Sequence, residues 1–267
     1  MIDSVIKCFK NPIRRIRNDG GFTCIFRSIG IIGDSLSSGE HESLINGQKG
    51  YHDYYEHSWG QYLARKCGVN VFNFSVGGLS AIKFFEYINT NNPFDKNKFC
   101  EAYMIALGVN DLNHLNDYYP DGFGSIDDIN FGNEDLNKKS FVGQYVRIIQ
   151  KLRKFEPKCR IFVITIPNEK SEDMLQKKLR NDTRKFLIKL TTIFEFVYVI
   201  DLRKYGPVYN KRFLEKYFLG GHMNAMGYKF TSDMISTYVD YIIRHNFQDF
   251  KQVGFIGKDV HNEKEKW

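Results

Sequence analysis

Five short apolar runs, each followed by a turn and then by a helical pattern, most constrain how this chain folds. They are residues 24–32, 71–74, 102–107, 161–166 and 196–200. Each run is rich in β-branched and aromatic residues and apolar on both parities, as strands buried on both faces are. Helical patterns fall at residues 58–66, 81–88, 141–155, 172–194 and 225–245. Because strands alternating with helices form right-handed crossovers, we expect a parallel sheet with helices on both faces.

The length of 267 residues fits one large domain or two small ones. An apolar fraction of 42% supplies a sizeable core and excludes disordered and collagen-like chains. The alternation of strands and helices favours one domain over residues 23–246. Residues 1–22 hold a short apolar stripe beside basic residues, interrupted by Pro12. We expect an arm or helix docked on the domain there, rather than a membrane-surface helix, and a tail or edge strand over 247–267.

The charge, the apolar runs and the cysteines indicate which partners, metals and compartments this protein has. The net charge of +7 comes from 38 basic and 31 acidic residues that are interspersed, which indicates a mildly basic surface and no nucleic-acid partner. No apolar run approaches the roughly 18 residues of a membrane span, and the N-terminus lacks a signal-peptide pattern. Five scattered cysteines argue against a disulfide framework or a zinc site. A cytoplasmic protein without metal or cofactor is the expectation.

Two long polar segments interrupt the alternation. Residues 37–57 and 112–139 are rich in Gly, Asn, Asp and Tyr, and each follows the end of an apolar run. Loops of this length in a compact domain are usually functional or disordered. Since ligands bind outside the carboxyl ends of parallel strands, both segments are predicted to be lids over a site.

Chemistry-bearing residues follow three of the predicted strands. Ser35 stands in a Gly-Asp-Ser-Leu turn after the first, Gly78 comes after the second, and Asn110 after the third. His222 lies late in the chain, after a Gly-Gly pair. Because the carboxyl ends of parallel strands share one edge, the first three are expected to converge. A nucleophile, donors for an oxyanion and an imidazole are the set that acyl transfer needs.

These blocks resemble the SGNH (GDSL) hydrolases. The matching residues, in the family's order, are Gly33-Asp34-Ser35-Leu36, Gly78, Gly108-x-Asn110-Asp111 and Gly221-His222. The resemblance implies a flavodoxin-like three-layer α/β/α sandwich with a central parallel sheet of about five strands. It also implies Ser35 as nucleophile and His222 as general base and acid. The amides of Ser35 and Gly78 and the side chain of Asn110 would form the oxyanion hole.

The sequence departs from the family at one position. The family's last block usually carries Asp three residues before the histidine, where this chain has Leu219. Such a carboxylate fixes the imidazole tautomer, and its loss can cost around 10⁴-fold. We favour a Ser-His dyad. The alternatives are a substitute acid, with Asp201 or Glu215 as candidates, and an inactive relative.

The predicted function is that of a serine esterase. Polar lids favour a short acyl group, such as acetyl, on a polar or carbohydrate alcohol, although fold and motif do not fix the substrate. The alternatives are a glycan- or ester-binding protein that uses the same cleft, and a lipase or thioesterase of longer acyl chains. Asp34 and Asp111 are interpreted as acceptors that fix loops. The candidate substrate contacts are Asp34, Asp111, Asn113, His114 and Tyr118.

Overall fold

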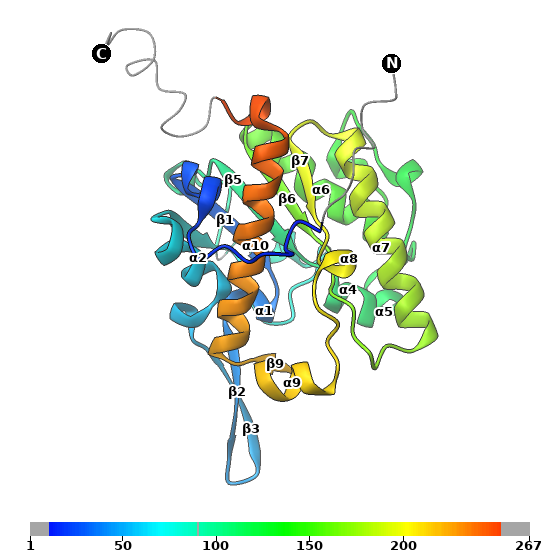
Figure 1. Ribbon diagram of the computed structural model, residues 1–267. Helices are drawn as coiled ribbons and strands as arrows, with labels where there is room; N and C mark the ends of the chain where they lie inside the picture. The colour runs from blue at the N-terminus through cyan, green and yellow to red at the C-terminus, as the bar shows by residue number, and fades with distance from the viewer. Residues whose placement is uncertain (1–10, 90, 252–267) are drawn as a thin grey trace, which may run out of the picture.

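A computed structural model describes residues 11–89 and 91–251, and its centre is a five-stranded parallel sheet (Figure 1). The strands lie in the order β4-β1-β5-β6-β7. Counted along the chain, these five strands therefore take the order 2-1-3-4-5 of flavodoxin-like folds, which confirms the predicted fold class. Their bounds are Ser28–Gly33 for β1, Asn70–Asn73 for β4, Ala102–Ala106 for β5, Arg160–Ile164 for β6 and Val197–Ile200 for β7.

Helices cover both faces of the sheet. One face packs against α2 (Trp59–Cys67) and α10 (Ala225–His245), the helix in front of the sheet in Figure 1. The other face packs against α3 (Phe84–Tyr87), α6 (Phe141–Phe155) and α7 (Met174–Ile193). The result is the three-layer sandwich.

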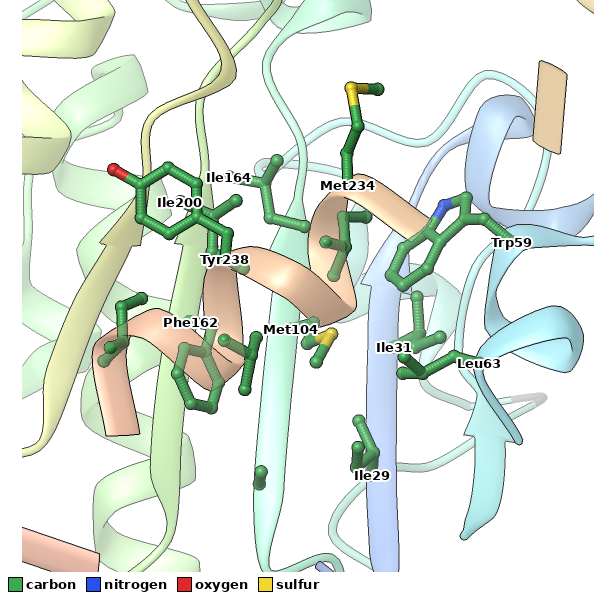
Figure 2. Close-up of a cluster of buried hydrophobic side chains, with 14 of the residues drawn as sticks. Ile29, Ile31, Trp59, Leu63, Met104, Phe162, Ile164, Ile200, Met234 and Tyr238 are labelled. Atoms are coloured by element: carbon green, nitrogen blue, oxygen red, sulfur yellow. The ribbon is translucent and has the colours of Figure 1, made fainter. Parts of the chain in front are cut away.

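Alternate residues along each strand enter opposite layers of the core. On β5, Met104 belongs to the cluster under α10, whereas Tyr103 and Ile105 belong to the cluster under α6. Figure 2 shows the first cluster, in which Met104 and Phe162 from neighbouring strands lie beneath α10. This period of two is that of a strand, and burial on both sides explains why the runs are apolar on both parities.

Two predicted elements are shorter than expected. The first apolar run begins as a 3-10 helix at Gly21–Ile25, because the Thr23 hydroxyl donates to the Ser236 carbonyl on α10. The second is α3, which begins only at Phe84. The N–H groups of Ala81 and Ile82 donate to side chains, so these residues form turns before the helix.

The first predicted lid is a β-hairpin. It consists of β2 (Glu40–Ile45) and β3 (Gln48–Asp53), and it extends away from the body of the molecule (Figure 1). Asn46 and Gly47 form its turn with φ of +51° and +77°, the left-handed conformation of a two-residue hairpin turn.

The second predicted lid packs on the body of the domain. It contains α4 (Val109–Asn113), α5 (Leu115–Tyr118) and two 3-10 turns, Ile126–Asp128 and Glu134–Leu136. The Asn137 amide donates to Gln150 on α6 at 2.8 Å, and Lys151 pairs with Glu134 at 2.9 Å. These contacts fix its last part against α6.

The terminal segments lie partly outside the described residues. Of the predicted N-terminal arm, residues 11–22 cross α10: Ile13 is buried, and the Arg17 N–H donates to Thr237 at 3.0 Å. After α10 the chain forms a 3-10 turn, Phe247–Phe250, and the Phe250 ring packs beside Phe162. Residues 1–10 and 252–267 are not described. No helix in the described part of the chain is long and apolar enough to cross a membrane.

Candidate active site

Ser35 begins a one-turn helix, α1 (Ser35–Ser38), directly after β1. Asp34 caps this helix: its carboxylate accepts the Leu36 N–H at 3.1 Å. Because β1 lies between β4 and β5, the turn opens at the point where the strand order reverses, which is where open parallel sheets bind ligands. Ser35 is partly exposed there, so its hydroxyl is accessible to a substrate.

Gly78 and Asn110 belong to the two neighbouring loops. Gly78 has φ of +73°, and a Cβ there would meet open space, so the backbone conformation rather than crowding favours glycine. Asn110 lies in the first turn of α4, and its Nδ2 donates to the Leu79 carbonyl at 3.2 Å. An amide carries two N–H groups, so one remains available for an oxyanion. Asp111 accepts the Ala81 N–H at 2.7 Å and binds the same loop.

His222 is brought to this edge by a short hairpin. It consists of β8 (Phe218–Leu219), the Gly220-Gly221 turn and β9 (His222–Met223). β9 lies against α1, the helix that carries Ser35. The structure thus brings the nucleophile block and the histidine block together. Ser35 and His222 share no hydrogen bond.

Two glutamates of β2 hold the two ring nitrogens of His222. Nδ1 lies 2.9 Å from Oε1 of Glu42, and Nε2 lies 2.9 Å from Oε1 of Glu40. Residues two apart on a strand point to the same face, which is why both carboxylates reach one imidazole. The side chains are only 9% exposed for Glu42 and 16% for Glu40.

The Glu42 carboxylate occupies a site shaped for it. Besides His222 it accepts the Gly221 N–H at 2.7 Å and pairs with Lys49 at 3.3 Å. A Cβ on Gly221 would lie 2.9 Å from its oxygen, and one on Gly220 would collide with it. Burial raises the pKa of Glu42, but the hydrogen bonds from His222 and the Gly221 N–H outweigh burial, so its pKa is below the usual range.

Neither carboxylate proposed from the sequence as the third member contacts His222. Asp201 is buried, pairs with Arg184 at 2.7 Å and accepts the Thr165 hydroxyl at 3.3 Å. Glu215 lies on α9 (Lys211–Tyr217), is 65% exposed and faces Lys211. The structure therefore does not support Asp201 or Glu215 as the third member, and two carboxylates contact His222 where a Ser-His dyad was favoured from the sequence.

The remaining candidates separate into loop-fixing and exposed residues. Asp111 has no exposed surface, so it fixes a loop and is not placed for substrate contact. Asp34 is only 4% exposed and also fixes a loop, but it lines the apolar cavity beneath α1, so its predicted substrate contact stays a prediction. Burial raises the pKa of Asp34 to about 7 and that of Asp111 to about 6. Asn113 and His114 are exposed, and His114 stacks on Tyr118. Their predicted role at the substrate stays a prediction.

An apolar cavity of about 90 Å³ lies beneath α1. An adjoining hollow of about 220 Å³ reaches Gly220 and Gly221. The two share the same wall, formed by Leu36, Val109, Ile166, Pro167 and Tyr209. Ser35 and His222 do not line either space, but Leu36 and Val109 directly neighbour Ser35 and Asn110 in the chain.

Sequence reasoning missed Glu40 and Glu42. The turn Asn46-Gly47 was the signal that could have found them, because this pair is typical of a two-residue hairpin and sets the strand on which both glutamates share a face. Within the described residues, no three His, Cys, Asp or Glu side chains are grouped as metal ligands.

Residues 29–235 match the family described as GDSL-like Lipase/Acylhydrolase. No curated protein shows significant sequence similarity to the chain.

Solved structures share the fold at low sequence identity. A family two carbohydrate esterase from Clostridium thermocellum, in complex with cellohexaose, is 14% identical with a TM-score of 0.57, covering 84% of this chain and 65% of that one. A family 2 carbohydrate esterase from Corynascus thermopiles (Myceliophthora fergusii) is 16% identical with a TM-score of 0.55, covering 82% and 67%. The lipase Lip_vut3 from a goat rumen metagenome is 17% identical with a TM-score of 0.54, covering 79% and 96%. The chain thus spans about two thirds of the length of the two carbohydrate esterases.

The raised pKa of Asp111 predicts a pH-dependent stability. In the unfolded chain an aspartate has a pKa near 3.9, against about 6 in the fold, so between these values the folded state holds the extra proton. The contribution of Asp111 to the free energy of unfolding is fully present below pH 4. It is lost as the pH rises through 6, which lowers the free energy of unfolding by about 1–3 kcal/mol. Asp111→Asn should remove that loss, measured by urea unfolding from pH 4.5 to 7.5. Asp117→Asn, at a side chain that is 75% exposed, is the control, and an unchanged slope for Asp111→Asn would contradict the prediction.

Proposed function

The chain belongs to the GDSL-like lipase/acylhydrolase family, whose members hydrolyse esters, and we propose that it is a serine esterase with Ser35 as nucleophile, His222 as base and Glu42 as the carboxylate that positions the base. The contact between Glu42 and His222 Nδ1 carries this proposal. It supplies from β2 the function of the carboxylate that the family usually has at the position of Leu219. The two-membered site expected from the sequence becomes a triad.

The proposed reaction follows acyl transfer to serine. His222 Nε2 takes the Ser35 proton while Oγ bonds to the ester carbonyl carbon, whose oxygen becomes an oxyanion. The amides of Ser35 and Gly78 and the Nδ2 of Asn110 stabilise this charge. The intermediate collapses, and the alcohol leaves with the proton from Nε2. Water that His222 deprotonates then attacks the acyl-enzyme and releases the acid.

Glu42 keeps the imidazole in the productive tautomer. Its carboxylate only accepts hydrogen bonds, so Nδ1 must carry the proton and Nε2 must face the serine. As the proton arrives at Nε2, the negative charge of Glu42 stabilises the imidazolium. The Gly221 N–H and Lys49 keep that carboxylate ionised and in place.

The substrate proposed is a short-chain ester of a polar or carbohydrate alcohol. The 90 Å³ cavity beside Leu36 is apolar but far smaller than the roughly 300–1,000 Å³ of pockets for drug-sized ligands, which favours a short acyl group such as acetyl. Polar side chains surround the histidine, including Glu40, Lys49 and the exposed Tyr51, which favours a polar alcohol. The fold also carries a lipase, so it does not itself decide the substrate.

Labelling with a fluorophosphonate distinguishes an esterase from a protein that only binds esters. We expect one probe per chain at Ser35, read by intact-protein mass and peptide mapping, and none in Ser35→Ala. The Ser38→Ala variant is the matched control, since Ser38 lies in the same one-turn helix and should leave the Ser35 label in place. Folded wild-type protein that neither takes the label nor hydrolyses p-nitrophenyl acetate would exclude the esterase.

The positioning carboxylate is tested with Glu42→Gln. Because Nδ1 loses its charged acceptor, kcat/KM for p-nitrophenyl acetate should fall by about 10²- to 10⁴-fold with KM little changed. Glu215→Gln, which removes an exposed carboxylate on α9, should keep wild-type rates. A loss of less than about tenfold in Glu42→Gln, with folding intact by circular dichroism, would show that His222 needs no carboxylate.

A series of p-nitrophenyl esters from acetyl to palmitoyl tests the size of the acyl group. We expect kcat/KM to be highest between acetyl and butyryl and to fall at least about tenfold by octanoyl, because a longer chain exceeds the apolar cavity. A maximum at ten or more carbons would instead support the lipase or thioesterase alternative.

A further inference from the structure

We propose that Glu40 is a built-in competitor of Ser35 for His222, so that the structure shows a resting state in which the base is blocked. This inference rests on the proposed function, because it concerns the regulation of that same site. It assigns opposite roles to two glutamates of one strand. Glu42 makes His222 a better base, and Glu40 prevents its Nε2 from reaching the Ser35 hydroxyl.

The blocking contact uses the one nitrogen that the reaction needs. Oε1 of Glu40 lies 2.9 Å from Nε2 of His222, where the hydroxyl of Ser35 must donate. The contact is that of an ion pair, and the carboxylate occupies the space beside Nε2 that the Ser35 hydroxyl needs. While Glu40 holds Nε2, Ser35 has no base, in agreement with the absence of a Ser35–His222 hydrogen bond.

The position of Glu40 is built into the fold. Its carbonyl accepts the Tyr228 hydroxyl from α10, which fixes the start of β2. Its second carboxylate oxygen lies against Gly77: a Cβ there would stand only 2.5 Å away. Gly77 precedes Gly78, the proposed oxyanion donor. The carboxylate of Glu40 therefore lies between His222 and the residue before Gly78.

Glu40 is the glutamate that can leave. Glu42 is held by Lys49 and by the Gly221 N–H in addition to His222. Among the described residues, by contrast, Glu40 pairs with no lysine or arginine and only with His222. Rotation of its side chain toward solvent is enough to free Nε2, with no change in the sheet. A polar alcohol entering the site would favour that rotation by taking its place.

The test compares Glu40→Ala and Glu40→Gln with Glu42→Gln in the full chain. The measurement is the second-order rate constant for labelling of Ser35 by a fluorophosphonate at pH 7, together with kcat/KM for p-nitrophenyl acetate. Removing the carboxylate that contacts Nε2 should raise the labelling rate of Glu40→Ala by about 5- to 30-fold. Glu40→Gln, which keeps the shape but not the charge, should show a smaller increase. Glu42→Gln should label more slowly than wild type.

Two controls show whether a higher labelling rate in a Glu40 variant comes from the loss of Glu40 and from reaction at Ser35. Glu56→Gln removes an exposed carboxylate, 80% accessible, just beyond the hairpin and should label at the wild-type rate. Glu40→Ala combined with Ser35→Ala should not label, which shows that the faster reaction is at Ser35. Circular dichroism and Tm identify a variant that fails to fold, in which case Glu40→Gln, the near-isosteric change, decides.

The outcomes separate this inference from the proposed function. Labelling of both Glu40 variants at the wild-type rate would show that Glu40 does not compete, and slower labelling would show that it assists the reaction. Either result overturns the inference while leaving the esterase in place. If folded wild-type protein takes no label at Ser35 and hydrolyses no p-nitrophenyl acetate, the proposed function itself fails.

Discussion

The place of β1 between β4 and β5 is the constraint from which the active site follows. The chain adds β4 on one side of β1 and β5 on the other, so the loop after β1 opens between two diverging loops. That loop carries Ser35, and its neighbours carry Gly78 and Asn110. The Asn110 amide donates to the Leu79 carbonyl, and the Asp111 carboxylate accepts the Ala81 N–H, so the loops after β4 and β5 are joined. The same contacts position Gly78 and Asn110, the proposed oxyanion donors.

The position of His222 depends on the contact between two hairpins. His222 comes from a short hairpin near the end of the chain and meets the long hairpin β2–β3, whose two glutamates hold its ring nitrogens. The Gly220-Gly221 turn leaves the room that the Glu42 carboxylate fills, and its N–H helps to keep that carboxylate charged. One strand thus supplies both carboxylates that contact His222.

Much of the fold and part of the site could be predicted from local patterns. Strands buried on both faces are apolar on both parities. Helices α6 and α10 begin and end at the predicted residues. Each is an amphipathic segment between an N-cap, Ser140 or Asn224, and a polar residue at its end, and such a pattern can be found from the local sequence. The predictions failed where contacts overrode the local pattern. Residues 24–26 lie outside β1 although they are apolar. The polar segment 37–57 contains a hairpin, which the Asn46-Gly47 turn could have predicted.

The sequence by itself determined the sheet, its helices and the family, and it predicted the nucleophile, oxyanion and histidine blocks. Each depends on a periodicity or a short motif, and parallel strand ends must meet at one edge. Only the tertiary structure decided which carboxylate serves His222. Asp201 and Glu215 are nearer to His222 in the sequence, but Asp201 pairs with Arg184 and Glu215 is exposed to solvent. Glu42 lies 180 residues from His222 in the sequence and contacts its imidazole. Such a pairing depends on the direction in which a hairpin leaves the domain, and no local pattern of residues encodes that direction.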